Sequence, residues 1–317
     1  MEINTNKLVD FTLPDSFCTV EGEIQILKFE NNFANVVSRY RKHHKGSSIR
    51  KIRFHDELMF SAAKTIKITD LHQQKVVRVI DNDKTKIYSL LVADDYLICA
   101  GDDEGNFKVW DYRSERPIHM SLHECDGYIS DLDIDSQRRI VVASSGEGTL
   151  TAFNLRSRRM EQPQSELFES GFQCIRFVEE KDKVIVGCED GVLNIFNKNE
   201  WGNISDRFPI KQNTTGLNSI DCLEMLDELN VVFGCSDGTL QMASLFPHQP
   251  LNVITNQNSG IESLDVNQIS KQVVATSLNN IKLFSYEINQ SDGNNVNNKK
   301  GNKLTTVKGD NFFADLA

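Results

Sequence analysis

The sequence has few of the features that indicate metal clusters, disulfides or membrane segments. Its 317 residues include seven cysteines, an odd number, with no Cys-x-x-Cys pair. A disulfide framework or a zinc knuckle is therefore not expected. No stretch reaches the roughly 20 apolar residues that span a bilayer, and Met1 to Asp10 lacks the basic segment and apolar run of a secretory signal. We expect an intracellular protein without membrane contact, whose cysteines mostly act as small buried hydrophobic residues.

Motifs that carry catalysis are also missing. The chain has no Gly-rich phosphate loop, no His-Glu-x-x-His and no nucleophile elbow. His43 and His44 are adjacent, and in an extended segment their side chains would diverge, so a metal site is not expected there. Paired acids such as Asp102-Asp103 stand at turns, where carboxylates bond the backbone of the turn. The sequence thus predicts a protein with no catalytic residue, no metal and no cofactor.

Positive charge is in short supply. Lys and Arg number 35 against 45 Asp and Glu, which gives a net charge of −10. A protein that coats nucleic acid needs a basic footprint, so this class is disfavoured. Apolar residues make up 39% and charged residues 25% of the chain, as in a soluble globular protein with a large core. Protein partners, or RNA bound through one local basic patch, stay open.

What the sequence does contain is an internal repeat. Five segments share a β-rich run, small or acidic residues, a Gly turn and a second β-rich run, and two degenerate copies fill the gaps. The turn positions are 22, 64, 105, 148, 191, 238 and 279, spaced by 41 to 47 residues. This spacing is typical of WD-type propeller blades, and the alternation of apolar and polar residues has the period of strands. The repeat predicts an all-β fold with seven blades.

The repeat resembles the WD40-repeat family, whose namesake dipeptide is intact at Trp110-Asp111. The family's Gly-His dipeptide is absent, so we assign its full hydrogen-bond tetrad to no blade. The resemblance implies a seven-bladed β-propeller over residues 1–286 and a disordered Asn/Lys/Gly-rich tail over 287–317. The first blade is compressed, because nine positions separate Leu13 from Gly22, against fourteen between Ile134 and Gly148. The strand that would close the ring is expected to be short or missing.

Particular stretches also resemble the WD repeat-containing protein 55 family. They include Trp201 to Phe208 and Ser219 to Cys222, and the likeness runs from about Leu8 to Tyr286. This family is nuclear and nucleolar and is linked to ribosomal RNA production. The resemblance therefore implies a protein-binding scaffold in ribosome biogenesis, with pre-ribosomal factors as partners.

A second interpretation comes from Trp110-Asp111-Tyr112-Arg113. In propellers that serve cullin-type ubiquitin ligases, a Trp-Asp-x-Arg sequence after the third strand of a blade contacts the ligase adaptor. Trp110, Asp111 and Arg113 are then partner-binding residues on the bottom face. Alternatively, Asp111 and Arg113 merely finish a strand.

Two further segments are candidates for binding. Trp201 lies in the longest interval between blades, and a large aromatic residue in a loop is a common interface anchor, but it could instead cap the edge of a blade. The loop between blades one and two is basic, through Arg39, Arg41, Lys42 and Lys45. Basic side chains beside an aromatic suit phosphate contact with base stacking, so this top-face loop is predicted to bind RNA or an acidic partner. A solvated loop or a nuclear-import signal explains it equally well.

Overall fold

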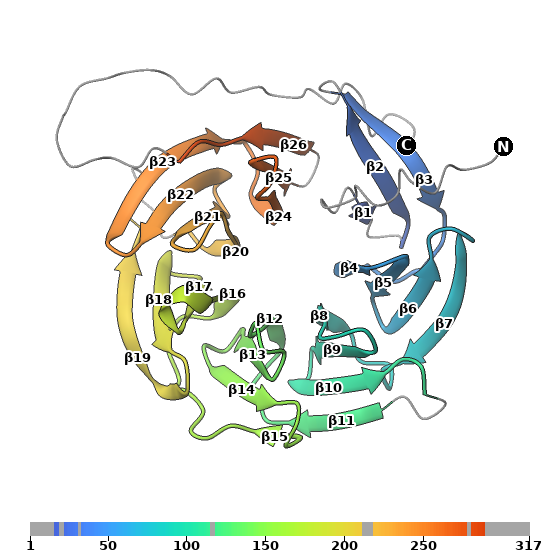
Figure 1. Ribbon diagram of the computed structural model, residues 1–317, viewed down its shortest axis with the longest axis horizontal. Helices are drawn as coiled ribbons and strands as arrows, with labels where there is room; N and C mark the ends of the chain where they lie inside the picture. Colours follow the sequence, from blue (N-terminus) through green and yellow to red (C-terminus); the bar gives the residue numbers. More distant parts are fainter. Residues whose placement is uncertain are drawn as a thin grey trace.

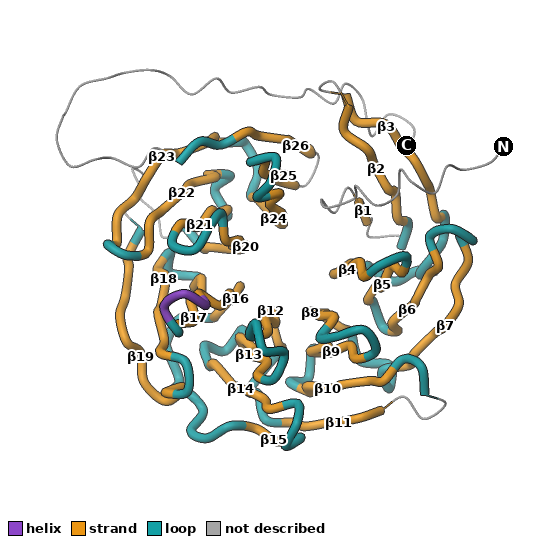
Figure 2. Tube along the Cα trace, viewed as in Figure 1, coloured by secondary structure: helices purple, strands orange, loops and turns teal. Residues whose placement is uncertain are grey.

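In the computed structural model, seven antiparallel sheets stand around a central axis (Figures 1 and 2). The structure describes residues 16–18, 22–30, 33–114, 118–210, 218–277 and 280–288. The first sheet is β1 (Ser16–Cys18), β2 (Ile24–Glu30) and β3 (Phe33–Tyr40). Blade two is β4 (Lys51–His55), β5 (Leu58–Ala62), β6 (Thr65–Asp70) and β7 (Lys75–Asp81). Blade three is β8 (Ile87–Val92), β9 (Leu97–Asp102), β10 (Asn106–Asp111) and β11 (Ile118–His123).

The remaining sheets follow in chain order. Blade four is β12 (Ile129–Ile134), β13 (Ile140–Ser145), β14 (Leu150–Asn154) and β15 (Arg159–Met160). Blade five is β16 (Phe172–Val178), the short 3-10 helix η2 (Glu179–Lys181), β17 (Lys183–Cys188), β18 (Val192–Asn197) and β19 (Glu200–Pro209). Blade six is β20 (Ile220–Met225), β21 (Asn230–Cys235), β22 (Thr239–Leu245) and β23 (His248–Asn256). Blade seven is β24 (Ile261–Asn267), β25 (Gln272–Ser277) and β26 (Asn280–Ser285).

The turn between the second and third strands repeats around the ring and defines the upper face. Gly148 and Gly238 occupy it with φ of +87° and +88°, in the left-handed region that glycine adopts without strain. A Cβ on Gly148 would lie 2.6 Å from the Phe168 carbonyl oxygen, so no larger residue fits. The lower face carries the turns after the first and third strands. The predicted repeat of strands and turns is confirmed.

Among the described residues, the first sheet has no innermost strand. Gly22 accepts a backbone hydrogen bond from His44, as Gly148 does from Phe168, which identifies β1, β2 and β3 as the second, third and fourth strands. Six sheets therefore have an innermost strand among the described residues: β4, β8, β12, β16, β20 and β24. The all-β propeller is confirmed, but seven complete blades are not: the structure has six blades and one partial sheet. The segment that the sequence predicted to be compressed, from Leu13 to Gly22, lies mostly outside the described residues.

The predicted limits of the domain stay predictions. Residues 1–15 and 289–317 lie outside the described residues, and so does most of the predicted tail. Blade seven has three strands, and no strand pairing joins it to the first sheet within the part of the chain that the structure describes.

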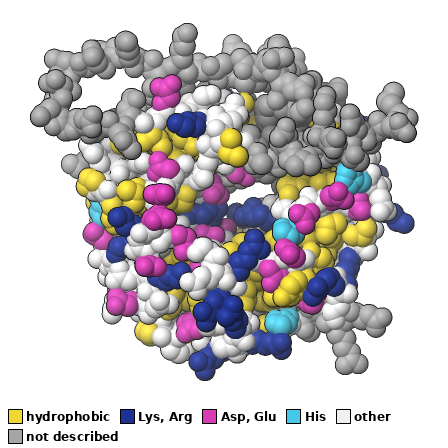
Figure 3. All heavy atoms as spheres, in the orientation of Figure 1, with side chains coloured by type: hydrophobic (Ala, Val, Ile, Leu, Met, Phe, Trp, Pro, Cys, Tyr) yellow, Lys and Arg dark blue, Asp and Glu magenta, His cyan; other side chains and the backbone are white. Residues whose placement is uncertain are grey.

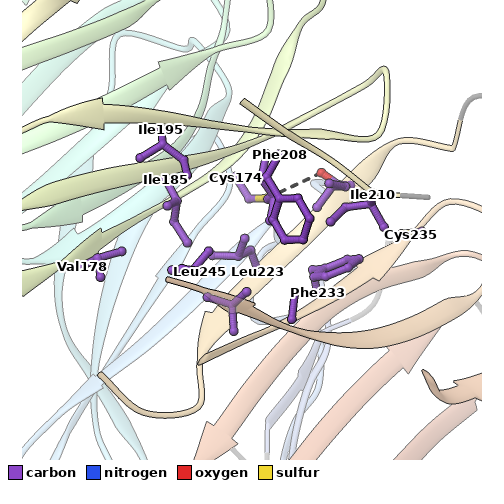
Figure 4. Packing of buried hydrophobic residues seen from close by; sticks show 14 residues of the cluster. Cys174, Val178, Ile185, Ile195, Phe208, Ile210, Leu223, Phe233, Cys235 and Leu245 are labelled. Atoms are coloured by element: carbon purple, nitrogen blue, oxygen red, sulfur yellow. Dashed lines mark hydrogen bonds between the residues drawn. The ribbon is translucent and has the colours of Figure 1, made fainter. Parts of the chain in front are cut away.

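Apolar side chains fill the spaces between neighbouring blades. Ile185 and Ile195 of blade five pack with Leu223 and Phe233 of blade six (Figure 4). Cys174 lies in the same cluster, and its thiol contacts the carbonyl oxygen of Ile220 at 3.5 Å. Six cysteines are buried and free, as predicted for small buried hydrophobic residues: Cys99, Cys125, Cys174, Cys188, Cys222 and Cys235.

Candidate functional site

Trp110 is a core residue. It lies in β10 with 3% of its surface exposed, and it packs with Phe60, Ile66 and Ile98 between blades two and three. This burial places the Trp110 indole in the core, and partner binding by Trp110 stays a prediction. Neighbouring blades cover both faces of β10, so the indole has no route to the surface.

Asp111 and Arg113 form a closed turn on the lower face. The Asp111 Oδ1 accepts hydrogen bonds from the Arg113 backbone N–H at 3.0 Å and from its Nε at 3.2 Å. The Arg113 guanidinium lies 4.0 Å from the centroid of the Tyr96 ring, yet 60% of the side chain is exposed. These contacts finish the strand, and they also present Arg113 in a fixed orientation. Adaptor binding by this pair stays a prediction.

Trp201 caps the edge of a blade. It is 2% exposed at the start of β19, where it packs with Phe172 and Phe196 of blade five and Ala152 of blade four. Its position in β19 agrees with the alternative of a blade-edge cap, and partner binding by Trp201 stays a prediction. The interval between blades five and six is long, but β19 occupies much of it as a ten-residue strand rather than a loop.

In the basic loop, one residue forms an ion pair and three are exposed. Arg39 belongs to β3 and pairs with Glu23, with 3.7 Å between Nε and Oε1. Arg41, Lys42 and Lys45 are exposed in the turn that follows. Three cations thus remain available on the upper face, and RNA or acidic-partner binding by this loop stays a prediction.

His43 and His44 are structural. Both are buried, with ring centroids 5.2 Å apart in a turn, so the expectation of diverging rings in an extended segment is wrong. His44 Nε2 lies 2.9 Å from Ser61 Oγ, and His43 Nε2 lies 3.3 Å from Thr69 Oγ1. Burial lowers the pKa of His43 to about 4 and of His44 to about 3, so both rings are neutral at physiological pH. They tie the partial first sheet to blade two.

A cluster of charged residues lies in the central channel, and the sequence did not predict it. Alternate residues of the innermost strands line a cavity of about 390 Å³. The strand registers place equivalent residues at one level, namely Arg53, Leu91, Asp133, Arg176, Glu224 and Asp265. Figure 3 shows the hollow with basic and acidic side chains inside it. The signal in the sequence is a polar residue at the same position of successive repeats.

Arg176 connects three blades across this channel. Its Nη1 donates to Asp131 Oδ2 at 2.6 Å, and its Nε donates to Glu224 Oε2 at 3.0 Å. Lys51 Nζ lies 3.3 Å from the other oxygen of Asp131. These cations hold the pKa of the Asp131 carboxyl well below its usual range, although its burial acts in the opposite direction. The pairing compensates Asp131 and Glu224 and braces blades four, five and six.

Two other carboxyls lack such compensation. Burial raises the pKa of Asp133 to about 6 and that of Asp265 to about 7. Each accepts a backbone hydrogen bond, Asp133 from Phe177 at 2.7 Å and Asp265 from Val266 at 2.6 Å. The channel therefore carries groups that change charge near neutral pH.

Replacing Asp265 with asparagine should make the protein more stable at pH 8 and leave stability at pH 4 nearly unchanged. The pKa of this aspartate is near 7 in the folded protein and near 3.9 in the unfolded chain. The free energy of unfolding therefore decreases as the pH rises from about 3.9 to about 7. The asparagine amide does not ionise, so the free energy of unfolding of the variant does not decrease in this way. The difference is on the order of a few kcal/mol, since each pKa unit corresponds to about 1.4 kcal/mol. Urea unfolding across this pH range measures it. A constant difference between the two proteins would contradict the assignment.

Catalytic machinery is not evident in the described ranges. The buried thiols of Cys174 and Cys222 have a pKa raised well above the ordinary value by burial, so neither supplies a thiolate. No group of three or more His, Cys, Asp or Glu side chains is arranged for a metal ion among the residues that the structure describes. Within the same part of the chain, no helix has the length and apolar character to cross a membrane.

The sequence profile of the WDR55 family matches residues 16–290. The chain is 27% identical to the WD repeat-containing protein 55 homologs of Drosophila persimilis and Drosophila melanogaster, over 95% of this chain and 61% and 62% of theirs. It is 26% identical to the homolog of Drosophila ananassae, over 98% of this chain and 68% of that protein. The chain thus spans about three fifths of the length of most of these relatives.

Among solved structures, the chain is similar to the crystal structure of the computationally designed Ika8 protein. The TM-score is 0.67 at 18% sequence identity, over 86% of this chain and 80% of the other. At this identity the likeness concerns the fold alone.

Proposed function

Because the chain belongs to the WDR55 family, we propose that it is a non-enzymatic scaffold in ribosomal RNA production and ribosome biogenesis, located in the nucleus and nucleolus. The match over residues 16–290 carries the proposal, since it covers nearly all of the propeller. Its partners are pre-ribosomal proteins. The specific role rests on the resemblance of this chain to a nucleolar family, and the geometry supports the scaffold.

The architecture favours binding over chemistry. Innermost strands pack on one another from blade two to blade seven, and the Arg176 network adds polar contacts between three of these blades. A ring of this kind keeps its surface turns in fixed positions, and pre-organised surfaces lose little entropy when they bind. The exposed turns of both faces are therefore suited to hold several partners at once.

Arg113 favours one second candidate, a substrate receptor of a cullin-type ubiquitin ligase. Its guanidinium rests on the Tyr96 ring and stays 60% exposed on the lower face. A positioned, accessible arginine is the element that the Trp-Asp-x-Arg interpretation requires. Since Trp110 is buried, only Asp111 and Arg113 of that motif could contact an adaptor.

Affinity purification of the tagged full-length protein separates the two functions. We expect pre-ribosomal proteins to copurify with wild type and equally with Arg113→Ala. Arg50→Ala is a matched control, because the Arg50 guanidinium also rests on a tyrosine, 3.9 Å from the Tyr88 centroid. Loss of an exposed charge should leave the melting temperature of both variants nearly unchanged. Capture of a ligase adaptor by wild type and Arg50→Ala but not Arg113→Ala, without pre-ribosomal proteins, would favour the second candidate.

A further inference from the structure

The turn after the innermost strand is acidic in four of the blades. These turns contain Asp56 and Glu57 in blade two, Asp94 and Asp95 in blade three, Glu179 and Glu180 in blade five, and Asp227 and Glu228 in blade six. Blades five to seven also share a lower-face cavity of about 700 Å³, lined by the last four of these acids. Blade four is different, because its turn ends in Arg138 and Arg139.

Strand pairing brings three more arginines to the same end of blade four. Ile140 pairs with Asn154, and Asn154 pairs with Arg159, so the two lower-face turns lie side by side. The Leu155 N–H donates to the Arg139 carbonyl oxygen at 2.9 Å, which joins the turns directly. The blade-four arginine patch consists of Arg138, Arg139, Arg156, Arg158 and Arg159. In Figure 3, basic side chains gather over β13 to β15.

No ion pair with a described residue neutralises the arginines of the patch. Four of the arginines are exposed and Arg139 is half-buried, and none of the five makes an ion pair with a described residue. The nearby acids contact other groups. Asp135 Oδ2 lies 3.4 Å from Lys198 Nζ, and Glu161 accepts a hydrogen bond from Asn154 at 2.7 Å. Glu179 accepts one from the Ser136 N–H at 2.7 Å and lies 3.5 Å from Lys198 Nζ.

The two turns are also held rigidly. Asp135 Oδ1 accepts from the Arg139 N–H at 2.7 Å, and Asn154 Oδ1 accepts from the Arg156 N–H at 3.0 Å. Side-chain caps of this kind fix the backbone of a turn. The guanidinium groups therefore start from a positioned backbone, which reduces the entropy lost on binding.

We infer that the blade-four arginine patch binds the phosphate backbone of RNA. Guanidinium groups match phosphate oxygens with two parallel hydrogen bonds, and clusters of them suit a chain that carries one phosphate per nucleotide. On the lower face, the acidic turns of blades two and six repel a polyanion, which directs the RNA toward blade four. This inference deepens the proposed function, on which it rests for the biological source of the RNA.

An aromatic residue beside the patch favours RNA over an acidic peptide. Arg138 Nη1 donates to the Ala93 carbonyl oxygen at 3.1 Å, which links the patch to the blade-three turn that carries Tyr96. Tyr96 is 37% exposed and stacks with Arg113. Unpaired bases stack on aromatic rings and on guanidinium planes. Carboxylate side chains have no ring and do not stack in this way.

The test compares purified full-length proteins in fluorescence anisotropy with a short labelled single-stranded RNA of mixed sequence. The patch variant combines Arg156→Glu, Arg158→Glu and Arg159→Glu. The control variant combines Lys64→Glu, Lys75→Glu and Lys86→Glu, which changes the net charge equally at exposed residues of blade two and the turn that follows it. At ~100 mM salt, the affinity of the patch variant for the RNA should be lower by about tenfold or more. The slope of log affinity against log salt concentration should become less steep by about 2, because each lost phosphate contact contributes about 0.7. The control should change affinity by less than about threefold, as expected for longer-range screened charge.

Several outcomes would overturn the inference. They are an equal loss in the two variants, no loss in the patch variant, or no RNA binding by wild type. If polyglutamate displaces the labelled RNA as effectively as unlabelled RNA of equal charge does, the patch is a binding site for acidic proteins and the inference is wrong. Melting temperatures of the variants confirm that each protein is folded. If wild type fails to bind RNA yet purifies with pre-ribosomal proteins, the inference fails and the proposed function stands.

Discussion

Replacing Arg176 with methionine is expected to lower the free energy of unfolding by about 3–5 kcal/mol. The Arg176 side chain is 13% exposed and bonds Asp131 and Glu224 from two other blades. Its removal leaves Asp131 buried with Lys51 alone and Glu224 without its bridge. An uncompensated buried charge is costly because the channel cannot solvate it as water does. Urea unfolding at pH 8 measures the loss.

The control for this change is Arg158→Met, at an exposed arginine of the same ring. Substitution there should alter the free energy of unfolding by no more than about 0.5 kcal/mol. Adding Asp131→Asn and Glu224→Gln to Arg176→Met should restore part of the lost stability, since it removes the stranded charges. A loss at Arg176 as small as that at Arg158 would show that the channel network does not brace the blades.

Replacing Trp201 with alanine is expected to cost about 3–5 kcal/mol of stability. The indole is 2% exposed and fills space between blades four and five with Phe172 and Phe196. Its loss leaves a cavity that rigid strands fill poorly. Trp201→Phe should cost clearly less, because a ring still occupies most of the space. Thermal unfolding of the three proteins tests this order. A stable Trp201→Ala protein that lost a binding partner would return Trp201 to the role of an interface anchor.

The sequence predicted the propeller because its repeat is spaced almost evenly and marked by glycine turns. It predicts a compressed first blade from the distance between Leu13 and Gly22, but a count of turns does not reveal how many strands each blade contains. The burial of the two tryptophans could not be predicted for a related reason. Whether Trp110 and Trp201 face solvent depends on how neighbouring blades pack, and the period of a strand does not contain that information.

The binding surfaces were harder to predict. Arg176 and Glu224 lie in segments whose apolar and polar residues alternate as in any strand with one solvated face. The polar faces of these strands line a common channel only because the blades are arranged in a ring. The arginine patch joins residues from two turns that are brought together by the register of Ile140, Asn154 and Arg159. The basic loop, by contrast, is contiguous in sequence and can be predicted from it, although its neighbouring residues His43 and His44 are buried.

The rate of ribosomal RNA synthesis and maturation tests the central claim most directly. Cells depleted of the protein would be pulse-labelled, and newly made precursor and mature ribosomal RNA would be followed over time. The account predicts less mature ribosomal RNA with altered precursor levels, restored by wild-type protein and by the Lys64, Lys75 and Lys86 control variant. Unchanged labelling of precursor and mature ribosomal RNA in cells that lack the protein would contradict it.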